Sequence, residues 1–463
     1  MREIVCDVAV IGAGTAGIAA HRAALDAGAT SILIERGPGG TTCARVGCMP
    51  SKLVIAAAHA AHGARGAGLF GVHVETVRID GPAVMERVRA ERDRFVGGVF
   101  DGLDDLPEGS RLAGEARFED AATLTVGDHT RLTFRAAVIA TGSSPSVPEP
   151  LKDLGDRVLT TDTLFEIETL PESLAVIGGG AVGLEMAQAF ARLGVRTLLF
   201  DPGAQLGTLS DPDLVRAARE IFGQEIDLRL GAEIRRAERS GQGVTLHWSS
   251  EDGSEGSERV ACVLAAAGRP PNLSRLGLER AGLRLDEHGT PAFDPRSLAC
   301  EGAPIFVAGD ANHARPLLHE ASRQGRIAGA NAAALVAGRG LDAPAPWPKF
   351  GLVFTHPQIA VLGSPYDGEA GDRIVGEVDG CDQGRSRIEG VNQGGMRLYA
   401  DRSGRLIGAE MIGPAVEHIA HIVTYALQDG LTAQAMLERP FYHPTVEEGL
   451  QTALRDVARQ VDA

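Results

Sequence analysis

The sequence contains the same glycine pattern twice, and this repetition restricts the fold more than any other feature. The two copies are Gly12-x-Gly14-x-x-Gly17 and Gly178-x-Gly180-x-x-Gly183. Each copy follows a short apolar segment that is typical of a buried strand and precedes an alanine-rich or apolar segment that is typical of a helix. A strand, a glycine turn and a helix in this order are typical of a unit that binds the pyrophosphate of a dinucleotide.

An acidic residue ends the next apolar segment of each copy. Glu35 lies 23 positions after Gly12, and Asp201 lies 23 positions after Gly178. An acid at this place accepts hydrogen bonds from the hydroxyls of a ribose. Two units with equal spacing therefore predict two dinucleotide sites. Residues 200–207 contain no arginine that could pair with a 2′-phosphate, which favours NAD(H) over NADP(H) at the second site.

A cysteine pair follows the first unit. Residues 40–52, GTTCARVGCMPSK, place Cys43 and Cys48 five positions apart. The pair could be a disulfide that takes part in chemistry, two metal ligands, or two inert buried thiols. A metal site usually needs a second pair of ligands at short spacing, and the other four cysteines are scattered, so no metal site is expected. The local sequence leaves the other two explanations open.

Length and charge exclude several classes of protein. A chain of 463 residues is too long for one hydrophobic core, so several domains are expected. The net charge of −16 argues against nucleic-acid binding, because phosphates would be repelled. No apolar segment is long enough to span a membrane, and the N-terminus lacks the apolar run of a signal peptide. A cytoplasmic location is therefore expected.

Further motifs give the chain a family resemblance. In order along the chain they are ATGSSP at 140–145, GRPPN at 268–272, AGD at 308–310, FTHPQIAVLG at 354–363 and HPTVEE at 443–448. Together with the glycine motifs and the cysteine pair, they make the chain resemble the pyridine nucleotide-disulfide oxidoreductases. This flavoprotein family includes dihydrolipoamide dehydrogenase, glutathione reductase and mercuric reductase. The resemblance covers nearly the whole chain.

The resemblance implies an α/β fold with two Rossmann-like dinucleotide-binding domains and a C-terminal α+β interface domain. The FAD-binding domain is expected at 1–145 and 270–344, and the NAD-binding domain at 146–269. The interface domain, at 345–463, begins after the proline-rich segment LDAPAPWPK. Such a domain implies a homodimer.

The resemblance also implies roles for individual residues. Cys43 and Cys48 are expected to form a redox-active disulfide, with Cys48 next to the flavin and Cys43 meeting the substrate. Lys52 is expected near the flavin and paired with Glu185. The residues expected to bind FAD or NAD are Gly12, Gly14, Gly17, Glu35, Lys52, Gly114, Ala116, Thr141, Gly142, Asp310, Gly178, Gly180, Gly183, Asp201 and Gly268.

Proton transfer needs a base, and the segment FYHPTVEEGL offers His443 with Glu448 five residues later. An imidazole oriented by a carboxylate takes the proton of a thiol near neutral pH. In the family, the base reaches the active site from the other protomer. His443 is therefore expected to act across a dimer interface.

Among the relatives, dihydrolipoamide dehydrogenase fits best. Asp201 argues against the NADP preference of glutathione reductases. The end of the chain lacks the extra cysteine pair of mercuric reductases and large thioredoxin reductases. Soluble transhydrogenases lack the first cysteine of the pair, which is present here as Cys43. The expected reaction is oxidation of dihydrolipoyl groups by NAD. The alternatives are NADH-dependent reduction of another disulfide, in a small thiol or a specialised lipoyl carrier, and a non-catalytic FAD-binding subunit.

Three residues depart from the family pattern. Thr41 replaces a glycine, Arg45 places a charge near Cys43, and Tyr442 precedes the expected base. These changes bear on the choice of disulfide rather than on the reaction class. The acidic composition would suit docking to a basic segment of a lipoyl-bearing multienzyme complex or carrier protein.

Overall fold

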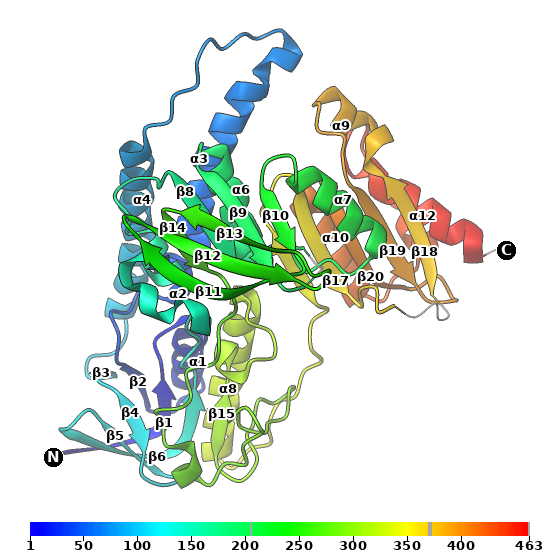
Figure 1. The fold of residues 1–463 in the computed structure, drawn as a ribbon. Coiled ribbons are helices and arrows are strands. Elements are labelled where there is room, and N and C mark those ends of the chain that lie inside the picture. Colours follow the sequence, from blue (N-terminus) through cyan, green and yellow to red (C-terminus); the bar gives the residue numbers. More distant parts are fainter. Residues whose placement is uncertain (204–205, 369–372, 462–463) are drawn as a thin grey trace. The chain divides into compact units, whose positions relative to one another are not determined.

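The structure, a computed structural model, describes residues 1–203, 206–368 and 373–461 (Figure 1). It contains two compact units, which are described separately. Unit 1 consists of residues 1–50, 89–146 and 268–346. Unit 2 consists of the described residues within 51–88, 147–267 and 347–463.

Unit 1 is built on a seven-stranded sheet in the order β3-β2-β1-β6-β5-β4, with β15 also paired to β6. The strands are β1 (Arg2–Ile11), β2 (Ser31–Glu35), β3 (Arg111–Ala113), β4 (Ala116–Phe118), β5 (Thr123–Val126), β6 (Thr130–Ile139) and β15 (Ile305–Val307). Strands β3, β2, β1, β6 and β15 pair in parallel, whereas β4 and β5 extend the sheet in antiparallel fashion. The parallel strands carry the first glycine motif at the carboxyl end of β1.

Two helices pack together beside this sheet. Helices α1 (Thr15–Asp26) and α8 (Leu318–Val336) lie side by side in Figure 1. The contact is close because a Cβ atom at Gly325 would lie 2.2 Å from the carbonyl oxygen of Ala16. The cysteine segment forms the short helix α2 (Thr42–Val46) and the start of α3 (Cys48–Gly66), which continues into η1 (Ala67–Phe70). Helix α4 (Gly81–Asp104) ends in unit 1, and η4 (Gly309–Asn312) follows β15.

Unit 2 contains a second parallel sheet, in the order β10-β9-β8-β14-β7. Its strands are β7 (Val158–Leu159), β8 (Ser173–Ile177), β9 (Arg196–Asp201), β10 (Asp227–Leu230) and β14 (Cys262–Ala265). Its helices are α5 (Thr161–Leu164), α6 (Ala181–Arg192) and α7 (Pro212–Phe222). A small antiparallel sheet is formed by β11 (Ala232–Ser240), β12 (Gly243–Ser250) and β13 (Glu255–Val260).

The C-terminal part of unit 2 is an antiparallel sheet in the order β16-β17-β20-β19-β18. Its strands are β16 (Phe350–Val353), β17 (Gln358–Gly363), β18 (Ile374–Asp379), β19 (Gly395–Ala400) and β20 (Leu406–Gly413). Helices α10 (Val416–Gln428) and α12 (Glu448–Val461) pack on it and bury a common apolar core. The shorter elements of this part are η5 (Gly380–Asp382), α9 (Gly384–Ile388) and α11 (Ala433–Leu437). Elsewhere in unit 2 lies η2 (Glu149–Arg157), and η3 (Leu278–Ala281) belongs to unit 1.

The structure confirms the predicted fold class, since both glycine motifs lie in parallel α/β sheets and the chain ends in an antiparallel α+β region. The boundaries of the three predicted domains stay a prediction. None of the described helices is both long and apolar enough to cross a membrane.

Candidate functional site

The first glycine motif makes the turn between β1 and α1. Gly12 has a φ of +104°, and a Cβ atom there would lie 2.3 Å from the carbonyl oxygen of Ala140. A Cβ atom at Gly17 would lie 1.7 Å from the carbonyl oxygen of Gly12, so the helix can pack on the turn only without a side chain. At Gly14, by contrast, a Cβ atom would meet nothing within 4 Å, so this position faces open space.

The second motif repeats this geometry between β8 and α6. Gly178 has a φ of +116°, and a Cβ atom there would lie 2.4 Å from the carbonyl oxygen of Ala266. A Cβ atom at Gly183 would lie 1.8 Å from the carbonyl oxygen of Gly178, and the position of Gly180 is again open. Both motifs therefore have the close approaches and the open middle glycine that a bound pyrophosphate requires.

The acid at the end of the next strand lies over the glycine turn in both units. Glu35 accepts hydrogen bonds from the backbone N–H of Ala13, at 2.8 Å, and of Gly37, at 2.7 Å. Asp201 is held in the same way by two backbone N–H groups, at 2.6 and 2.7 Å. These contacts fix each carboxylate beside its turn, where the sequence predicts a ribose.

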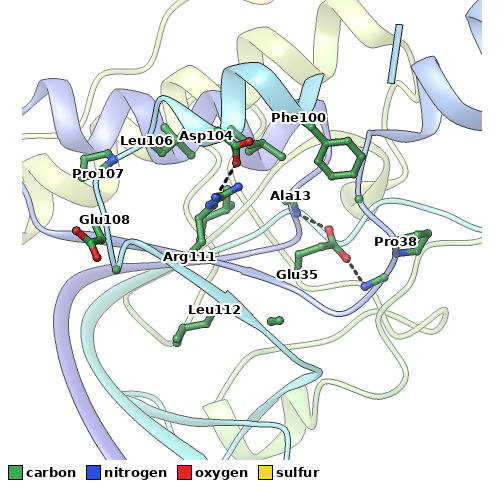
Figure 2. A pocket seen from close by; sticks show the side chains of 16 residues that line it. Ala13, Glu35, Pro38, Phe100, Asp104, Leu106, Pro107, Glu108, Arg111 and Leu112 are labelled. Atoms are coloured by element: carbon green, nitrogen blue, oxygen red, sulfur yellow. Dashed lines mark hydrogen bonds and ion pairs between the residues drawn. The ribbon is translucent and has the colours of Figure 1, made fainter. Parts of the chain in front are cut away.

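Glu35 forms part of a cavity of about 590 Å³ in unit 1 (Figure 2). The cavity is lined by Ala13, Leu33, Glu35, Gly37, Pro38, Gly39, Phe100, Leu103, Asp104, Leu106, Pro107, Glu108, Gly109, Arg111, Leu112 and Ala113. Figure 2 shows Arg111 directed toward Asp104, with which it forms an ion pair of 2.9 Å. Sequence reasoning missed Phe100 and Arg111, because no motif marks the end of α4 or the start of β3.

Two further predicted residues of unit 1 lie near the end of β6. The hydroxyl of Thr141 is buried and has no hydrogen-bond partner within the described parts of the chain. The next residue, Gly142, has a φ of +68°, and its carbonyl oxygen accepts a hydrogen bond from the N–H of Asn272. An orphaned hydroxyl, the open position at Gly14 and the cavity beside Glu35 together fit a bound dinucleotide.

The remaining predicted cofactor residues of unit 1 have different surroundings. Asp310, in η4, accepts a hydrogen bond of 2.7 Å from the hydroxyl of Ser143. Gly114 donates its N–H to the carbonyl oxygen of Glu35 and so lies beside the acid. Ala116 is buried in β4 within the apolar core and does not line the cavity. Gly268 has a φ of +100° and open space around it.

The cysteine pair lies on two consecutive helices. Cys43 is half-buried in α2, and Cys48 is exposed at the start of α3. Gly47 separates the helices, and a Cβ atom there would lie 3.3 Å from the Cα of Cys43. A side chain at Gly47 would therefore crowd the backbone of Thr42 and Cys43. The structure thus explains the glycine between the cysteines.

Two of the unusual residues in this segment have local roles. Thr41 caps α2 by accepting a hydrogen bond of 3.3 Å from the N–H of Ala44, at a φ of 58°. The guanidinium of Arg45 donates to the carbonyl oxygen of Gly39 at 2.9 Å and of Pro38 at 3.4 Å. These hydrogen bonds tie the charge of Arg45 to the preceding loop, and an effect of this charge on Cys43 stays a prediction.

In unit 2, Lys52 and Glu185 lie together as an ion pair of 2.8 Å. Lys52 belongs to α3, four residues after Cys48, and Glu185 belongs to α6, two residues after the last glycine of its motif. The side chain of Glu185 is 4% exposed, so the carboxylate is buried and paired. The ammonium group of Lys52 also lies 4.6 Å from the ring centre of Phe354, a residue that sequence reasoning did not single out.

His443 and Glu448 also lie together. The Nδ1 of His443 is 3.0 and 3.1 Å from the two carboxylate oxygens of Glu448. The hydrogen bond from His443, followed by that from the N–H of Thr445, lowers the pKa of Glu448. The imidazole is oriented through Nδ1, its side chain is 80% exposed, and its Nε2 is left for another group. Within the described ranges, no cluster of ligating side chains could hold a metal ion.

Comparison with known families decides the class. The model of the family described as pyridine nucleotide-disulphide oxidoreductase matches residues 6–325, and that of the family's dimerisation domain matches residues 350–454. The chain belongs to this family. The prediction from the sequence is thereby confirmed, as is the use of FAD and NAD as cofactors.

Relatives in this oxidoreductase family include more than one activity. The chain is 34% identical to a mercuric reductase of Streptomyces lividans, over 98% of this chain and 97% of the relative. It is 30% identical to a dihydrolipoyl dehydrogenase of Haloferax volcanii, over 98% of this chain and 96% of the relative. Its fold resembles the Cu(II) complex of RclA, an HOCl-induced flavoprotein disulfide reductase of Escherichia coli, at 22% identity and a TM-score of 0.84 over 98% of this chain and 99% of the other.

Proposed function

We propose that this oxidoreductase is a dihydrolipoyl dehydrogenase that oxidises dihydrolipoyl groups with NAD through a Cys43–Cys48 disulfide. The observation that carries the proposal is the cysteine pair itself, placed on two consecutive helices that are separated only by Gly47. Cys43 and Cys48 are the only two cysteines of the printed sequence that lie within ten positions of each other. Asp201, held over the second glycine turn, supports NAD as the acceptor.

The electrons and protons balance as follows. A dihydrolipoyl dithiol attacks Cys43, the Cys43–Cys48 bond breaks, and the lipoyl disulfide leaves as the cysteine pair gains two electrons. His443, oriented by Glu448, takes a proton from the attacking thiol. FAD, when bound, supplies the carrier through which the two electrons reach NAD. The products are the lipoyl disulfide, NADH and one proton.

The residues proposed to hold the cofactors follow from the two glycine motifs. Glu35, Thr141 and Asp310 would hold FAD in unit 1, and Asp201 would hold the NAD ribose in unit 2. The buried Glu185 would hold the ammonium group of Lys52 in one place within unit 2.

A second candidate substrate is Hg(II), because the chain is 32–34% identical to three mercuric reductases. Reduction of Hg(II) would consume NADH or NADPH and use the same cysteine pair. The resemblance gives mercuric reductases an extra cysteine pair late in the chain, and residues 382–463 contain no cysteine, so we rank this candidate second. Reduction of another small disulfide by NADH is a third possibility of the same chemical class.

The proposal is tested by comparing substrates on one preparation of the FAD-loaded protein. We expect rapid NAD reduction by dihydrolipoamide and slow NADH oxidation by glutathione disulfide or Hg(II). The cysteine variants C43S and C381S form a matched pair, since Cys381 is exposed but distant in sequence from the motif. C43S should lose turnover and keep FAD, whereas C381S should keep both. Dihydrolipoamide turnover by C43S would refute the mechanism.

The proposed partners follow from composition and family. The family's dimerisation domain supports a homodimer. The net charge of −16 would favour a basic segment on a lipoyl-bearing complex or carrier protein. Binding to such a partner should weaken as salt is raised from about 0.05 to 0.3 M, because exposed charges are screened. Binding that is insensitive to salt would contradict a charge-driven contact.

A further inference from the structure

Helix α6 presents three polar side chains to one backbone segment. Glu185, Gln188 and Arg192 are spaced three and four residues apart, so they share one face of the helix. All three bind the segment 354–356, which follows strand β16. A hydrophobic helix face would pack on this segment without fixing its backbone, whereas this polar face determines the position of each peptide group.

The contacts account for three of the six polar backbone groups of the segment. Glu185 accepts from the N–H of Phe354 at 2.9 Å. Gln188 accepts from the N–H of His356 at 2.8 Å and donates to its carbonyl oxygen at 2.7 Å. Arg192 donates to the same carbonyl oxygen at 2.8 Å. The segment is therefore held at both ends, and Phe354 cannot shift without breaking its hydrogen bond to Glu185.

Buried neighbours restrict Phe354 further. Val353 and Thr355, on either side of it, are 2% and 1% exposed. They anchor the chain, and the Phe354 ring itself is half-buried against the apolar core of unit 2. The ring centre lies 4.6 Å from the Nζ of Lys52, within the range of a cation–π interaction.

The carboxylate of Glu185 joins these contacts. Its Oε1 accepts from the N–H of Phe354, and its Oε2 pairs with Lys52 at 2.8 Å. One buried group therefore holds both the backbone of Phe354 and the cation that lies over the ring. The lysine is fixed from two directions by residues whose own positions are set by α6.

We propose that Phe354 is a positioning residue for Lys52: its ring, held by α6, keeps the ammonium group in one place. This inference rests on the proposed function, in which Lys52 serves the flavin-linked reaction. Phe354 itself need not touch the substrate. A flexible four-carbon side chain paired only with a carboxylate could sample several positions, and the ring would remove that freedom.

The first test measures how readily the amine of Lys52 is acetylated and needs no activity assay. The chain has only three lysines, so the rate of amine acetylation at Lys52 can be read by mass spectrometry with Lys152 and Lys349 as internal standards. Loss of a cation–π contact in F354L should raise the labelling rate of Lys52 about two- to fivefold, with the standards unchanged. F354Y, which keeps an aromatic ring, should label like the parent. Equal labelling of Lys52 in F354L and the parent would overturn the proposal.

A matched control separates positioning from packing. F350L removes a phenylalanine from strand β16, which precedes Phe354; Phe350 packs on the C-terminal core and against His421. We expect F350L to lower the melting temperature without altering Lys52 labelling. If F354L unfolds, F354M replaces it, because methionine fills the site without a ring. Unchanged labelling in F354M would then overturn the proposal.

A second readout uses the FAD-loaded protein and needs no disulfide substrate. The rate of flavin reduction by NADH should fall in F354L and recover in F354Y, at equal FAD content. If the flavin of FAD-loaded F354L is reduced as fast as that of the parent, the positioning role of Phe354 is contradicted and the proposed substrate is not. A parent protein that binds FAD, is reduced by NADH and yet does not turn over dihydrolipoamide contradicts the proposed substrate alone.

Discussion

Thr41 is a β-branched residue in a backbone conformation that suits glycine. Its φ is 58° and its ψ is 149°, immediately before the helix that carries Cys43. Such a conformation costs about 1–3 kcal/mol in a residue with a side chain, while the cap that its hydroxyl provides is worth about 1 kcal/mol. T41G loses the cap and gains freedom in the unfolded chain, but it removes the strain.

We therefore expect T41G to stabilise the protein by about 1 kcal/mol or less and to raise its melting temperature by about 1–2 °C. Thermal unfolding of the FAD-loaded protein, followed by flavin fluorescence, measures the change. T42G is the control, because Thr42 lies within α2 and a glycine there should destabilise the helix. A melting temperature that falls equally in both variants would show that Thr41 is not strained.

Residues joined by local sequence could be predicted from the residues themselves. Residues joined only by tertiary contact were predicted only where the family resemblance supplied the pair, as for Lys52 and Glu185. Glu35 and Asp201 were predicted, because a strand, a turn and a helix fix their positions relative to a nearby glycine motif. Phe354 was quoted within a motif but given no role, because its partner Glu185 lies 169 positions away. The cavity residue Arg111 follows no motif and was missed for the same physical reason.

At the scale of elements, a buried carboxylate joins strand β20 to the start of α7. Glu410 is fully buried and accepts hydrogen bonds from the N–H and hydroxyl of Ser210, at 2.6 and 2.8 Å. It also accepts from the N–H of Asp211 and of Tyr366, at 3.1 and 2.8 Å. Burial, followed by the charges of Glu410 and Asp211, raises the pKa of Tyr399, so its hydroxyl stays a donor to Glu410 at 3.3 Å.

E410Q replaces one of these acceptor oxygens by an amide NH₂ that faces backbone donors. We expect the free energy of unfolding to fall by about 2–4 kcal/mol, because at least two buried donors lose their partner. Urea unfolding at pH 7 measures it. E377Q is the control, since Glu377 lies on the same sheet with its side chain 58% exposed, and it should change stability by under about 0.5 kcal/mol. Equal stability of E410Q and the parent would show that water satisfies these donors.

The contacts of α6 with residues 354–356, called the clamp below, also make stability depend on pH. Burial, followed by the charge of Arg192, lowers the pKa of His356 from 6.5 to about 4. The unfolded chain binds a proton at this residue below about pH 6.5, but the folded chain does not until about pH 4. Stability is therefore lost as the pH falls through this window, by about 3 kcal/mol for this group.

H356N keeps the backbone contacts of the clamp and removes the titrating ring. We expect its free energy of unfolding to fall less than that of the parent between pH 6.5 and pH 4.5. His21 contributes to the stability that H356N still loses over this range. It is fully buried in unit 1, and burial lowers its pKa to about 4 as well. H288N, at a site that is 78% exposed, is the control. If the free energy of unfolding of H356N falls with pH as steeply as that of the parent, His356 is not the cause of the pH dependence.

For the whole molecule, the position of His443 bears on how many chains build one active site. Its side chain is 80% exposed, and that of Tyr442 is exposed as well. Both lie within the match to the dimerisation domain. An exposed and oriented base next to an exposed aromatic residue suits a surface that a second chain covers. The proposed mechanism then needs Cys43 from one chain and His443 from the other.

Mixed dimers test this arrangement directly. C43S and H443Q should each be inactive alone, but a C43S–H443Q dimer would contain one intact site, built from the unaltered residue of each chain. Random pairing at equal amounts makes half of the dimers mixed, so about a quarter of the parental activity should appear. If each site were built within one chain, every site would lack one residue and no activity would return. Mixing C43S with the double variant C43S/H443Q is the control, since no pairing there restores Cys43, and any activity in it would indicate contamination by the parent.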